Sequence, residues 1–253
     1  METRFKLVVP VYCAEKYIEK CLVSIINQRY QNYSCVIVDD ASLDRTAEKI
    51  NNIMKSLPDH IRNKFSLMKR THNVGALENI IAGVNRLKCE PDDVILLIDG
   101  DDFLYSTEVL GYLNEVYKAN PELLLTWGDY IQTSDNQRGV CGDIRVPIES
   151  YRKDVYGWCT SHLRTFKFRL YILIKDKDMR DENGKYYAMS WDLCLLFPML
   201  EMAGKDRIKY LNKILYCYCN ENALNDHVKD LRLQLAQAME IRSKPPYKYV
   251  KEI

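Results

Sequence analysis

The carboxylates of Asp99, Asp101 and Asp102 are the residues whose type and spacing point most directly to chemistry. Carboxylates this close together repel one another, and burial would strengthen the conflict because it disfavours the charged form. A divalent cation would remove the repulsion. Hard oxygen ligands suit Mg²⁺ or Mn²⁺, and such an ion could neutralise the charge of a diphosphate leaving group. An exposed Asp-Gly turn without any ligand is the alternative interpretation.

A second acidic turn holds Asp39 and Asp40, followed by Ser42 and Asp44. Ser42 or Asp44 can cap the helix that we expect next, because their side-chain oxygens accept the free N–H groups of its first turn. Asp39 and Asp40 precede the cap, so capping does not account for both. One of these carboxylates could accept hydrogen bonds from a nucleotide base or ribose hydroxyl, with ordinary turn chemistry as the alternative.

The elements that must position these turns alternate between strand and helix. Short apolar segments predict strands at 6–9, 34–38, 65–68 and 94–98, and apolar stripes predict helices at 14–28, 44–57 and 75–87. Strands that are apolar throughout are typical of a parallel sheet covered on both faces. In such sheets ligands bind beyond the carboxyl ends of the strands, so we expect both acidic turns at one sheet edge.

The second half of the chain is less regular. It predicts helices at 108–119 and 191–202, strands at 123–127 and 214–218, and a polar loop at 133–149. A final amphipathic helix would bury a stripe formed by Val228, Leu231, Leu235 and Met239. We expect the end of the chain, from Ser243 onward, to be a loose tail.

Composition narrows the class of protein. A net charge of +1 over 253 residues gives no reason to expect a nucleic-acid partner. The nine cysteines are scattered without a C-x-x-C pair, which favours buried small side chains in a reducing compartment over a zinc site or disulfides. The apolar runs are shorter than the ~20 residues of a membrane span, and no secretory signal is apparent. We therefore expect a cytoplasmic protein with no membrane span.

Three segments resemble, in order and spacing, the family-2 glycosyltransferases of the GT-A type: LVVPVYCAEKYIEKCLVSIINQRYQNYSCVIVDDASLDRT, NVGALENIIAGV and ILLIDGDD. The resemblance is close over residues 5–105 and more diffuse to about 220, where SWDLCLLFPMLEMAG is similar to the family's acidic acceptor-side helix. It implies an α/β, Rossmann-like nucleotide-diphospho-sugar transferase fold, with a mostly parallel central sheet flanked by helices. The catalytic domain would span 1–225, with a donor half at 1–105 and an acceptor half at 106–225, and a C-terminal helix and tail would follow at 226–253.

The resemblance also implies roles for individual residues. Pro10 and Tyr12 would line the nucleotide pocket, Asp40 would contact the base, and Asp101 and Asp102 would hold Mn²⁺ or Mg²⁺. Asp101 also resembles the acid on the ribose and diphosphate side. The expected nucleotide-sugar-binding residues are Pro10, Tyr12, Asp39, Asp40, Asn73, Gly75, Asn79, Asp99, Gly100, Asp101 and His162. His162 lies in a strand-like run and could contact diphosphate or acceptor, or could be a structural histidine.

The catalytic base is where the sequence departs from the family pattern. Relatives carry a Glu-Asp pair before an aromatic residue and a further acid, but this chain reads Met189-Ser190-Trp191-Asp192. Ser190 stands at the usual base position, which leaves Asp192 as the nearest carboxylate and the candidate base. A helix N-terminal acid favoured by the helix dipole is the alternative role for Asp192. We expect Arg164 and Lys167 to be solvated rather than to pair with phosphate.

The reaction implied by the resemblance moves a sugar from a nucleoside-diphosphate donor, with UDP as the commonest nucleotide, to an acceptor hydroxyl with inversion. The acceptor, whether glycan, protein or small molecule, stays open. A nucleotidyltransferase is a second enzyme class, but it usually begins with a Gly-rich phosphate loop, and residues 10–14 contain no glycine. A degenerate nucleotide-sugar- or glycan-binding module is the non-enzyme alternative, motivated by the missing Glu-Asp pair.

Overall fold

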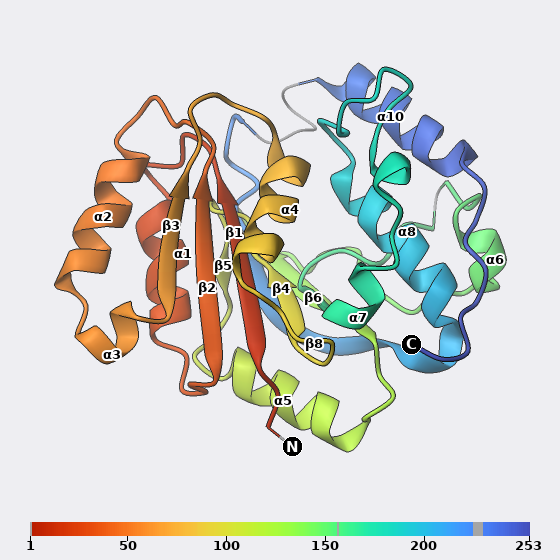
Figure 1. Ribbon diagram of the computed structural model, residues 1–253, viewed down its shortest axis with the longest axis horizontal. Coiled ribbons are helices and arrows are strands. Elements are labelled where there is room, and N and C mark those ends of the chain that lie inside the picture. Colours follow the sequence, from red (N-terminus) through yellow and green to blue (C-terminus); the bar gives the residue numbers. More distant parts are fainter. Residues whose placement is uncertain (1, 156, 225–229) are drawn as a thin grey trace.

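The computed structural model describes residues 2–155, 157–224 and 230–253, and its strands there form one eight-stranded sheet (Figure 1). The order of the strands is β3-β2-β1-β4-β7-β6-β8-β5. Their bounds are β1 Phe5–Val11, β2 Tyr33–Asp39, β3 Phe65–Lys69, β4 Val94–Leu97, β5 Phe103–Leu104, β6 Leu125–Gln132, β7 Arg164–Lys167 and β8 Ile208–Tyr218.

The sheet is mostly parallel, as the sequence predicts. β1 pairs in parallel with β2 and β4, β2 pairs in parallel with β3, and β6 pairs in parallel with β8. β7 is the exception at the centre of the sheet, because it runs antiparallel to both β4 and β6. The short β5 pairs antiparallel with β8 at the edge. The start of β7 therefore lies beside the end of β4.

Helices cover both faces of this sheet. They are α1 Ile18–Ile26, α2 Thr46–Ser56, α3 Asp59–Arg62, α4 Ala76–Arg86, α5 Val109–Ala119, α6 Ile148–Tyr151, α7 Phe168–Tyr171, α8 Trp191–Ala203 and α10 Leu231–Ser243, with short 3₁₀ helices at Asp176–Met179 and Lys205–Arg207. Apolar side chains of α1 and α5 belong to the core on one face of the sheet, and those of α4 and α8 belong to the core on the other. No helix in the described part of the chain is long and apolar enough to cross a membrane.

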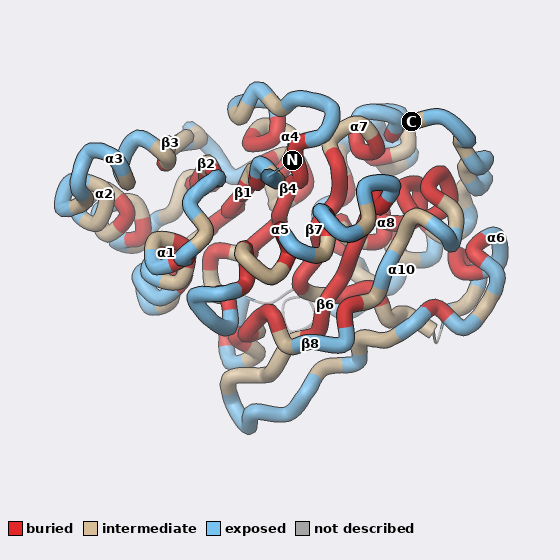
Figure 2. The backbone as a smooth tube through the Cα atoms, turned by 90° about the horizontal axis from the view of Figure 1, so that it is seen from below, coloured by how far each residue is buried: buried red, intermediate tan, exposed pale blue. Residues whose placement is uncertain are grey.

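The continuous apolar strands of the sequence follow from this two-sided covering. Successive strand residues point to opposite faces, so Val8 belongs to the core under α4 while Leu7 and Val9 belong to the core under α1. All three side chains are fully buried. Figure 2 shows β1, β4, β6 and β7 as a mainly buried centre within a more exposed periphery.

Apart from Asp192 and Glu201, helix α8 is apolar on all sides. It is buried along its length, and only Asp192 in its first turn is partly accessible. A buried ion pair fixes its surroundings. Nε and Nη2 of Arg152, next to α6, donate to the two carboxylate oxygens of Glu201 on α8, at 2.7 and 2.9 Å. The third nitrogen, Nη1, donates to the carbonyl of Ile241 on α10. One guanidinium therefore joins three helical segments.

Two expectations for the C-terminal region are wrong. In α10, Leu231, Leu235 and Met239 are 54%, 56% and 70% exposed, whereas Gln237 and Ile241 are buried. Polar contacts set the orientation of this helix, since the Gln237 side chain accepts a hydrogen bond from the Met189 N–H. Val228, the fourth member of the predicted stripe, and the expected boundary at 225/226 lie outside the described residues.

The segment after Ser243 is not loose. The Tyr247 N–H donates to Glu201 at 2.8 Å, and the Tyr247 hydroxyl donates to Asp178 at 2.6 Å. Farther along, the Val250 N–H donates to the carbonyl of Met202. Hydrogen bonds from backbone N–H groups therefore anchor the chain end on α8. The apolar periodicity of the sequence does not predict such bonds.

We predict that Glu201→Ala destabilises the protein by about 3–5 kcal/mol, because it leaves the Arg152 guanidinium buried without its partner. Denaturant unfolding followed by circular dichroism measures the effect. Asp59→Ala is the matched control, since it breaks the exposed Arg62–Asp59 pair and should cost about 0–1 kcal/mol. Equal losses in the two variants would contradict the structural role assigned to Glu201.

Candidate active site

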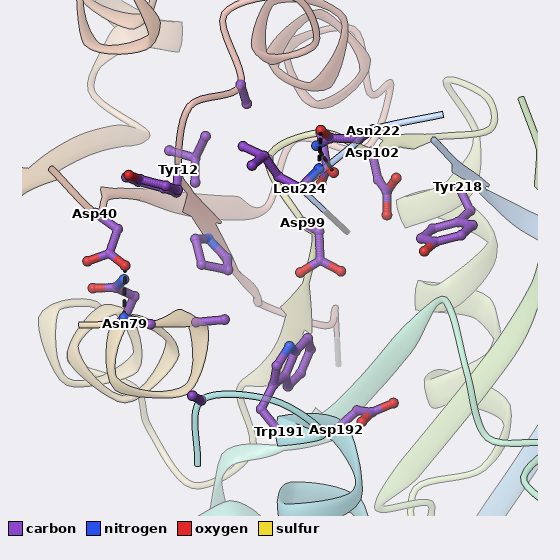
Figure 3. A pocket seen from close by; sticks show the side chains of 18 of the residues that line it. Tyr12, Asp40, Asn79, Asp99, Asp102, Trp191, Asp192, Tyr218, Asn222 and Leu224 are labelled. Carbon is purple, nitrogen blue, oxygen red and sulfur yellow. Dashed lines mark hydrogen bonds between the residues drawn. The ribbon is translucent and has the colours of Figure 1, made fainter. Parts of the chain in front are cut away.

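A cavity of about 300 Å³ opens beyond the carboxyl ends of β1, β2 and β4 (Figure 3). The loop before α4, the segment leading into β7, the first turn of α8 and the segment after β8 complete its walls. The sheet therefore brings the two acidic turns to one edge, where open α/β sheets bind ligands. Asp40 and Asn79 lie at one end of the cavity, and Trp191 and Asp192 lie across from Asp99.

Most residues singled out by the sequence line this one cavity. They are Pro10, Tyr12, Asp40, Asn73, Gly75, Asn79, Asp99, Gly100, Asp101, Asp102, His162 and Asp192. Asp39 is the exception among the expected nucleotide-sugar-binding residues. It is buried at the end of β2, where its carboxylate accepts a hydrogen bond from the Ser42 N–H at 3.2 Å. Asp39 therefore supports the turn, whereas its neighbour Asp40 lines the cavity.

The Asp40 carboxylate ties two loops together. Its oxygens accept hydrogen bonds from the backbone N–H groups of Val74 and Gly75, at 2.8 and 2.9 Å. Gly75 has a φ of +91°, in the region that favours glycine, which explains a glycine at the entry to α4. A carboxylate oxygen can accept more than one hydrogen bond, so Asp40 retains capacity for a ligand. Behind it, the side-chain oxygen of Asn79 accepts from Arg70 at 2.9 Å.

Of the two residues expected to cap the next helix, Asp44 bonds to its first turn, whereas Ser42 bonds to another loop. Asp44 accepts hydrogen bonds from the backbone N–H of Thr46, the first residue of α2, and from that of Glu15. Ser42 accepts from the N–H of Cys13 at 2.9 Å. Asp44 and Ser42 thus hold the loops after β1 and β2 against each other and are not among the residues that line the cavity.

The acidic turn after β4 is held at several points. Asp101 accepts a hydrogen bond from the Asn222 side chain, and Oδ1 of Asp102 accepts from the Cys219 N–H, both at 2.7 Å. Oδ2 of Asp102 is buried and has no hydrogen-bond partner among the described residues. Buried polar atoms without partners are rare in folded proteins and call for a reason. A cation would supply one here.

The electrostatics of the turn agree with the conflict expected from its sequence. Burial raises the pKa of Asp102 well above its usual value, and the negative charges of Asp101 and Asp99 raise it further. Burial also raises the pKa of Asp101, while the hydrogen bond from Asn222 opposes that shift. The protein thus holds carboxyl groups where their charged form is disfavoured unless positive charge arrives.

His162 lies two residues before β7 and close to this turn. The donor atoms of Asp99, Asp102 and His162 all lie within 4.8 Å of one another. Desolvation lowers the pKa of His162 well below its usual value, with Arg164 adding to the effect, so the neutral imidazole is favoured. These three residues form a group compact enough for a metal ion. The resemblance to the family instead implies Asp101 and Asp102 as the metal ligands.

Asp192 lies in the first turn of α8 and forms an ion pair. Its Oδ2 accepts a hydrogen bond from Arg164 at 3.0 Å, and the Arg164 guanidinium stacks over the Trp191 ring. The Arg164 side chain is only 5% exposed, so the expectation that it is solvated is wrong. Lys167 is buried as well, and its ammonium donates to the carbonyl of Pro121. Ser190 donates to the carbonyl of Gln234 and lines the cavity.

Sequence reasoning missed several residues of the cavity, above all Asn222 and Tyr218. Tyr216 and Tyr218 are two residues apart in β8, so their side chains share one face of the sheet, and this periodicity was an available signal. Nothing near Asn222 in the sequence indicates its contact with Asp101, which lies 121 positions earlier in the chain.

The sheet and its flanking helices have the GT-A fold, which the solved structures reported below share. The chain belongs to glycosyl transferase family 2, whose family model matches residues 6–179. An uncharacterized glycosyltransferase of Haemophilus influenzae is 32% identical over 124 residues, which are 49% of this chain and 46% of that protein. Glycosyltransferase GlyA of Streptococcus pneumoniae is 23% identical over 231 residues, which are 86% of this chain and 31% of that protein. The chain thus spans less than half the length of these relatives.

Solved structures share the fold. S. aureus TarS 1-349 in complex with UDP-GlcNAc has a TM-score of 0.69 and 19% identity, covering 94% of this chain and 64% of that chain. The mannosyltransferase PcManGT from Pyrobaculum calidifontis, in complex with GDP-Man and Mn²⁺, has a TM-score of 0.61 and 18% identity, covering 98% and 66%. At these identities the similarity concerns the fold.

We predict that Gly100→Ala destabilises the protein by about 1–3 kcal/mol, the usual cost of overpacking. An added Cβ would lie 2.5 Å from Cβ of Val11 and 3.0 Å from the carbonyl oxygen of Pro10, so the acidic turn would have to move off β1. Denaturant unfolding is the measurement. Gly142→Ala, where an added Cβ meets nothing within 4 Å, is the control and should leave stability nearly unchanged. If both variants unfold alike, the close approach of the turn to β1 is not a constraint.

Proposed function

We propose that this chain transfers a sugar from a nucleoside-diphosphate donor, with UDP as the nucleotide, to an acceptor hydroxyl in a metal-dependent, inverting reaction. The observation that carries the proposal is the arrangement of the cavity. A loop-anchored carboxylate, Asp40, lies at one end, the acidic turn of Asp99 to Asp102 lies in the middle, and Asp192 lies across from Asp99. The complexes of TarS with UDP-GlcNAc and UDP support the choice of nucleotide.

In this proposal the donor lies along the carboxyl edge of the sheet. The base and ribose occupy the end lined by Pro10, Tyr12, Asp40, Asn73 and Asn79, where Asp40 accepts a hydrogen bond from a base N–H. The diphosphate lies over Gly100 and the acidic turn. Asp39 is left out of the donor site because its carboxylate supports the turn at the end of β2.

The acidic turn fits a divalent cation, Mn²⁺ or Mg²⁺. The reason is the chemistry of the oxygens present, above all the unpartnered, buried Oδ2 of Asp102 among carboxylates that repel one another. When bound, such an ion supplies positive charge for the departing diphosphate. The Mn²⁺ complex of the mannosyltransferase neighbour supports this part of the proposal.

Asp192 is the proposed general base for the acceptor hydroxyl. Its carboxylate lines the cavity at the first turn of α8, and Arg164 holds it in position through a hydrogen bond at 3.0 Å. Asp192 would take the proton of the hydroxyl as it attacks the anomeric carbon. The attack would come from the side opposite the diphosphate, so it would invert that centre. We also propose a cytoplasmic location, on the ground that the cysteines in the described part of the chain form no disulfide with one another.

A catalytically degenerate nucleotide-sugar-binding module is the second candidate. Ser190 at the position where relatives carry an acid, together with the ion pair that occupies Asp192, favours it. Such a module would bind the donor as tightly as an enzyme does but would not turn it over.

The first test separates these candidates by donor binding and hydrolysis. We expect UDP-sugars with Mn²⁺ to raise the unfolding temperature, since a ligand at about 100 times its Kd stabilises the folded state by about 2.7 kcal/mol. We also expect release of UDP and free sugar. Asp102→Asn should lose the metal-dependent part of both effects, whereas Asp206→Asn, an exposed acid outside the cavity, should behave like the wild type. Donor binding without any UDP release would favour the module.

The second test concerns Asp192. We expect Asp192→Asn to lower kcat for donor turnover by about 10²–10⁴, the usual contribution of a general base, with little change in donor Kd. Asparagine still offers Arg164 a hydrogen-bond acceptor, so the fold should hold. Steady-state kinetics with donor binding by calorimetry make the measurement, with Asp206→Asn again as the control. An unchanged kcat would remove Asp192 from the mechanism.

A further inference from the structure

We propose that Asp99, Asp102 and His162 together bind the divalent cation, and that the imidazole makes the site prefer Mn²⁺ to Mg²⁺. This inference rests on the metal dependence in the proposed function and adds a nitrogen ligand that the acidic turn alone does not provide. It also replaces the assignment of the ion to Asp101 and Asp102 that the resemblance to the family implies.

The topology of the sheet brings His162 to the acidic turn. β7 runs antiparallel to β4, with Leu96 opposite Thr165 and Ile95 opposite Phe166. Beyond the last paired residues, the chain after β4 and the chain before β7 bring ligand atoms of Asp99 and His162 within 4.8 Å of each other. Parallel strands place at this edge only the residues that follow them. Because β7 is antiparallel, a residue that precedes it lies at the same edge.

The distances suit coordination. The candidate donor atoms of Asp99, Asp102 and His162 all lie within 4.8 Å of one another. Two ligand atoms that lie about 2.1 Å from an ion on opposite sides of it are about 4.2 Å apart. Small side-chain movements would therefore bring these three atoms to bonding distance of one ion. Oδ1 of Asp102 is fixed by the Cys219 N–H, and its buried Oδ2 has no hydrogen-bond partner in the described chain.

The surrounding aromatic residues hold the imidazole in place. Its ring stacks on Tyr216, with centroids 4.6 Å apart and planes 2° apart, and on Tyr218 at 5.5 Å, while Tyr130 meets it edge-on. The Tyr216 hydroxyl also accepts a hydrogen bond from the Asp99 N–H at 3.0 Å. One tyrosine therefore orients two of the three proposed ligands, as the groups around metal ligands commonly do.

Asp101 has a different role in this arrangement. Its Oδ2 accepts a hydrogen bond from Asn222 at 2.7 Å, which ties the acidic turn to the segment after β8. We infer that Asp101 positions this segment beside the cavity. Imidazole nitrogen suits transition metals better than Mg²⁺, which prefers oxygen ligands throughout, so the ligand set should favour Mn²⁺.

The experiment reads the ligand directly and does not require activity. The full chain is loaded with Mn²⁺ in the presence of UDP, and pulsed electron paramagnetic resonance is used to detect ¹⁴N modulation from a coordinated imidazole. We expect the modulation in the wild type and its loss in His162→Gln, with Mn²⁺ affinity weaker by roughly tenfold or more. The preference for Mn²⁺ over Mg²⁺, from competition titrations, should fall in the same variant.

Matched variants assign the signal. The sequence contains three other histidines, so His60→Gln, His72→Gln and His227→Gln should each retain the modulation. Asp101→Asn should retain it too, because Asp101 is not a proposed ligand. Thermal unfolding in EDTA checks that every variant folds. If His162→Gln does not fold, the wild-type spectrum still shows whether a nitrogen ligand is present.

The outcomes separate the inference from the proposed function. Mn²⁺ binding without a nitrogen ligand, or with one that disappears in another histidine variant, would overturn the inference and leave the metal-dependent transferase standing. If UDP-sugars bind but Mn²⁺ does not, the inference and the metal dependence both fail. If neither UDP-sugars nor Mn²⁺ bind, the proposed function fails with them.

Discussion

The mutual repulsion of carboxylates in the turn after β4 is the constraint around which the cavity is organised. Asp102 is buried where its charged form is disfavoured, and its neighbours Asp99 and Asp101 add to that penalty. Holding these carboxyl groups together costs free energy of folding, yet several contacts hold the turn in place. Gly100 allows close contact with the end of β1, and backbone and side-chain donors after β8 secure Asp102 and Asp101. A turn that is costly and yet so firmly fixed is what a preformed cation site requires.

The covering of both sheet faces by helices explains why the acidic turn lies beyond the end of a strand. Helices bury both faces of the strands, so the polar groups of the central region must gather at the sheet edges. Asp39 and Asp40 illustrate the rule within two residues. Asp39 still belongs to β2 and is used internally, whereas Asp40, just past the strand, reaches the cavity and anchors the loop before α4. The proposed donor end of the cavity thus follows from strand ends and consecutive side-chain directions.

The first half of the fold could be predicted because its elements are local. Each apolar strand and helical stripe is decided by neighbours within a few residues, and the parallel order follows from their alternation. The second half is decided by contacts between distant segments. Gln237 bonds to Met189, and Arg152 bonds to Glu201 and Ile241, so α10 turns its leucines outward against the apolar pattern. Periodicity cannot detect such polar contacts, and the role of Asn222 was hidden for the same reason.

Strand β7 links the two ends of the proposed reaction. His162 precedes it and lies beside the acidic turn, and Arg164, two residues later, holds Asp192 on the opposite wall. Both side chains line the cavity, so one antiparallel insertion can serve both the proposed cation site and the proposed base. A shift of β7 relative to β4 would therefore disturb both walls of the cavity together.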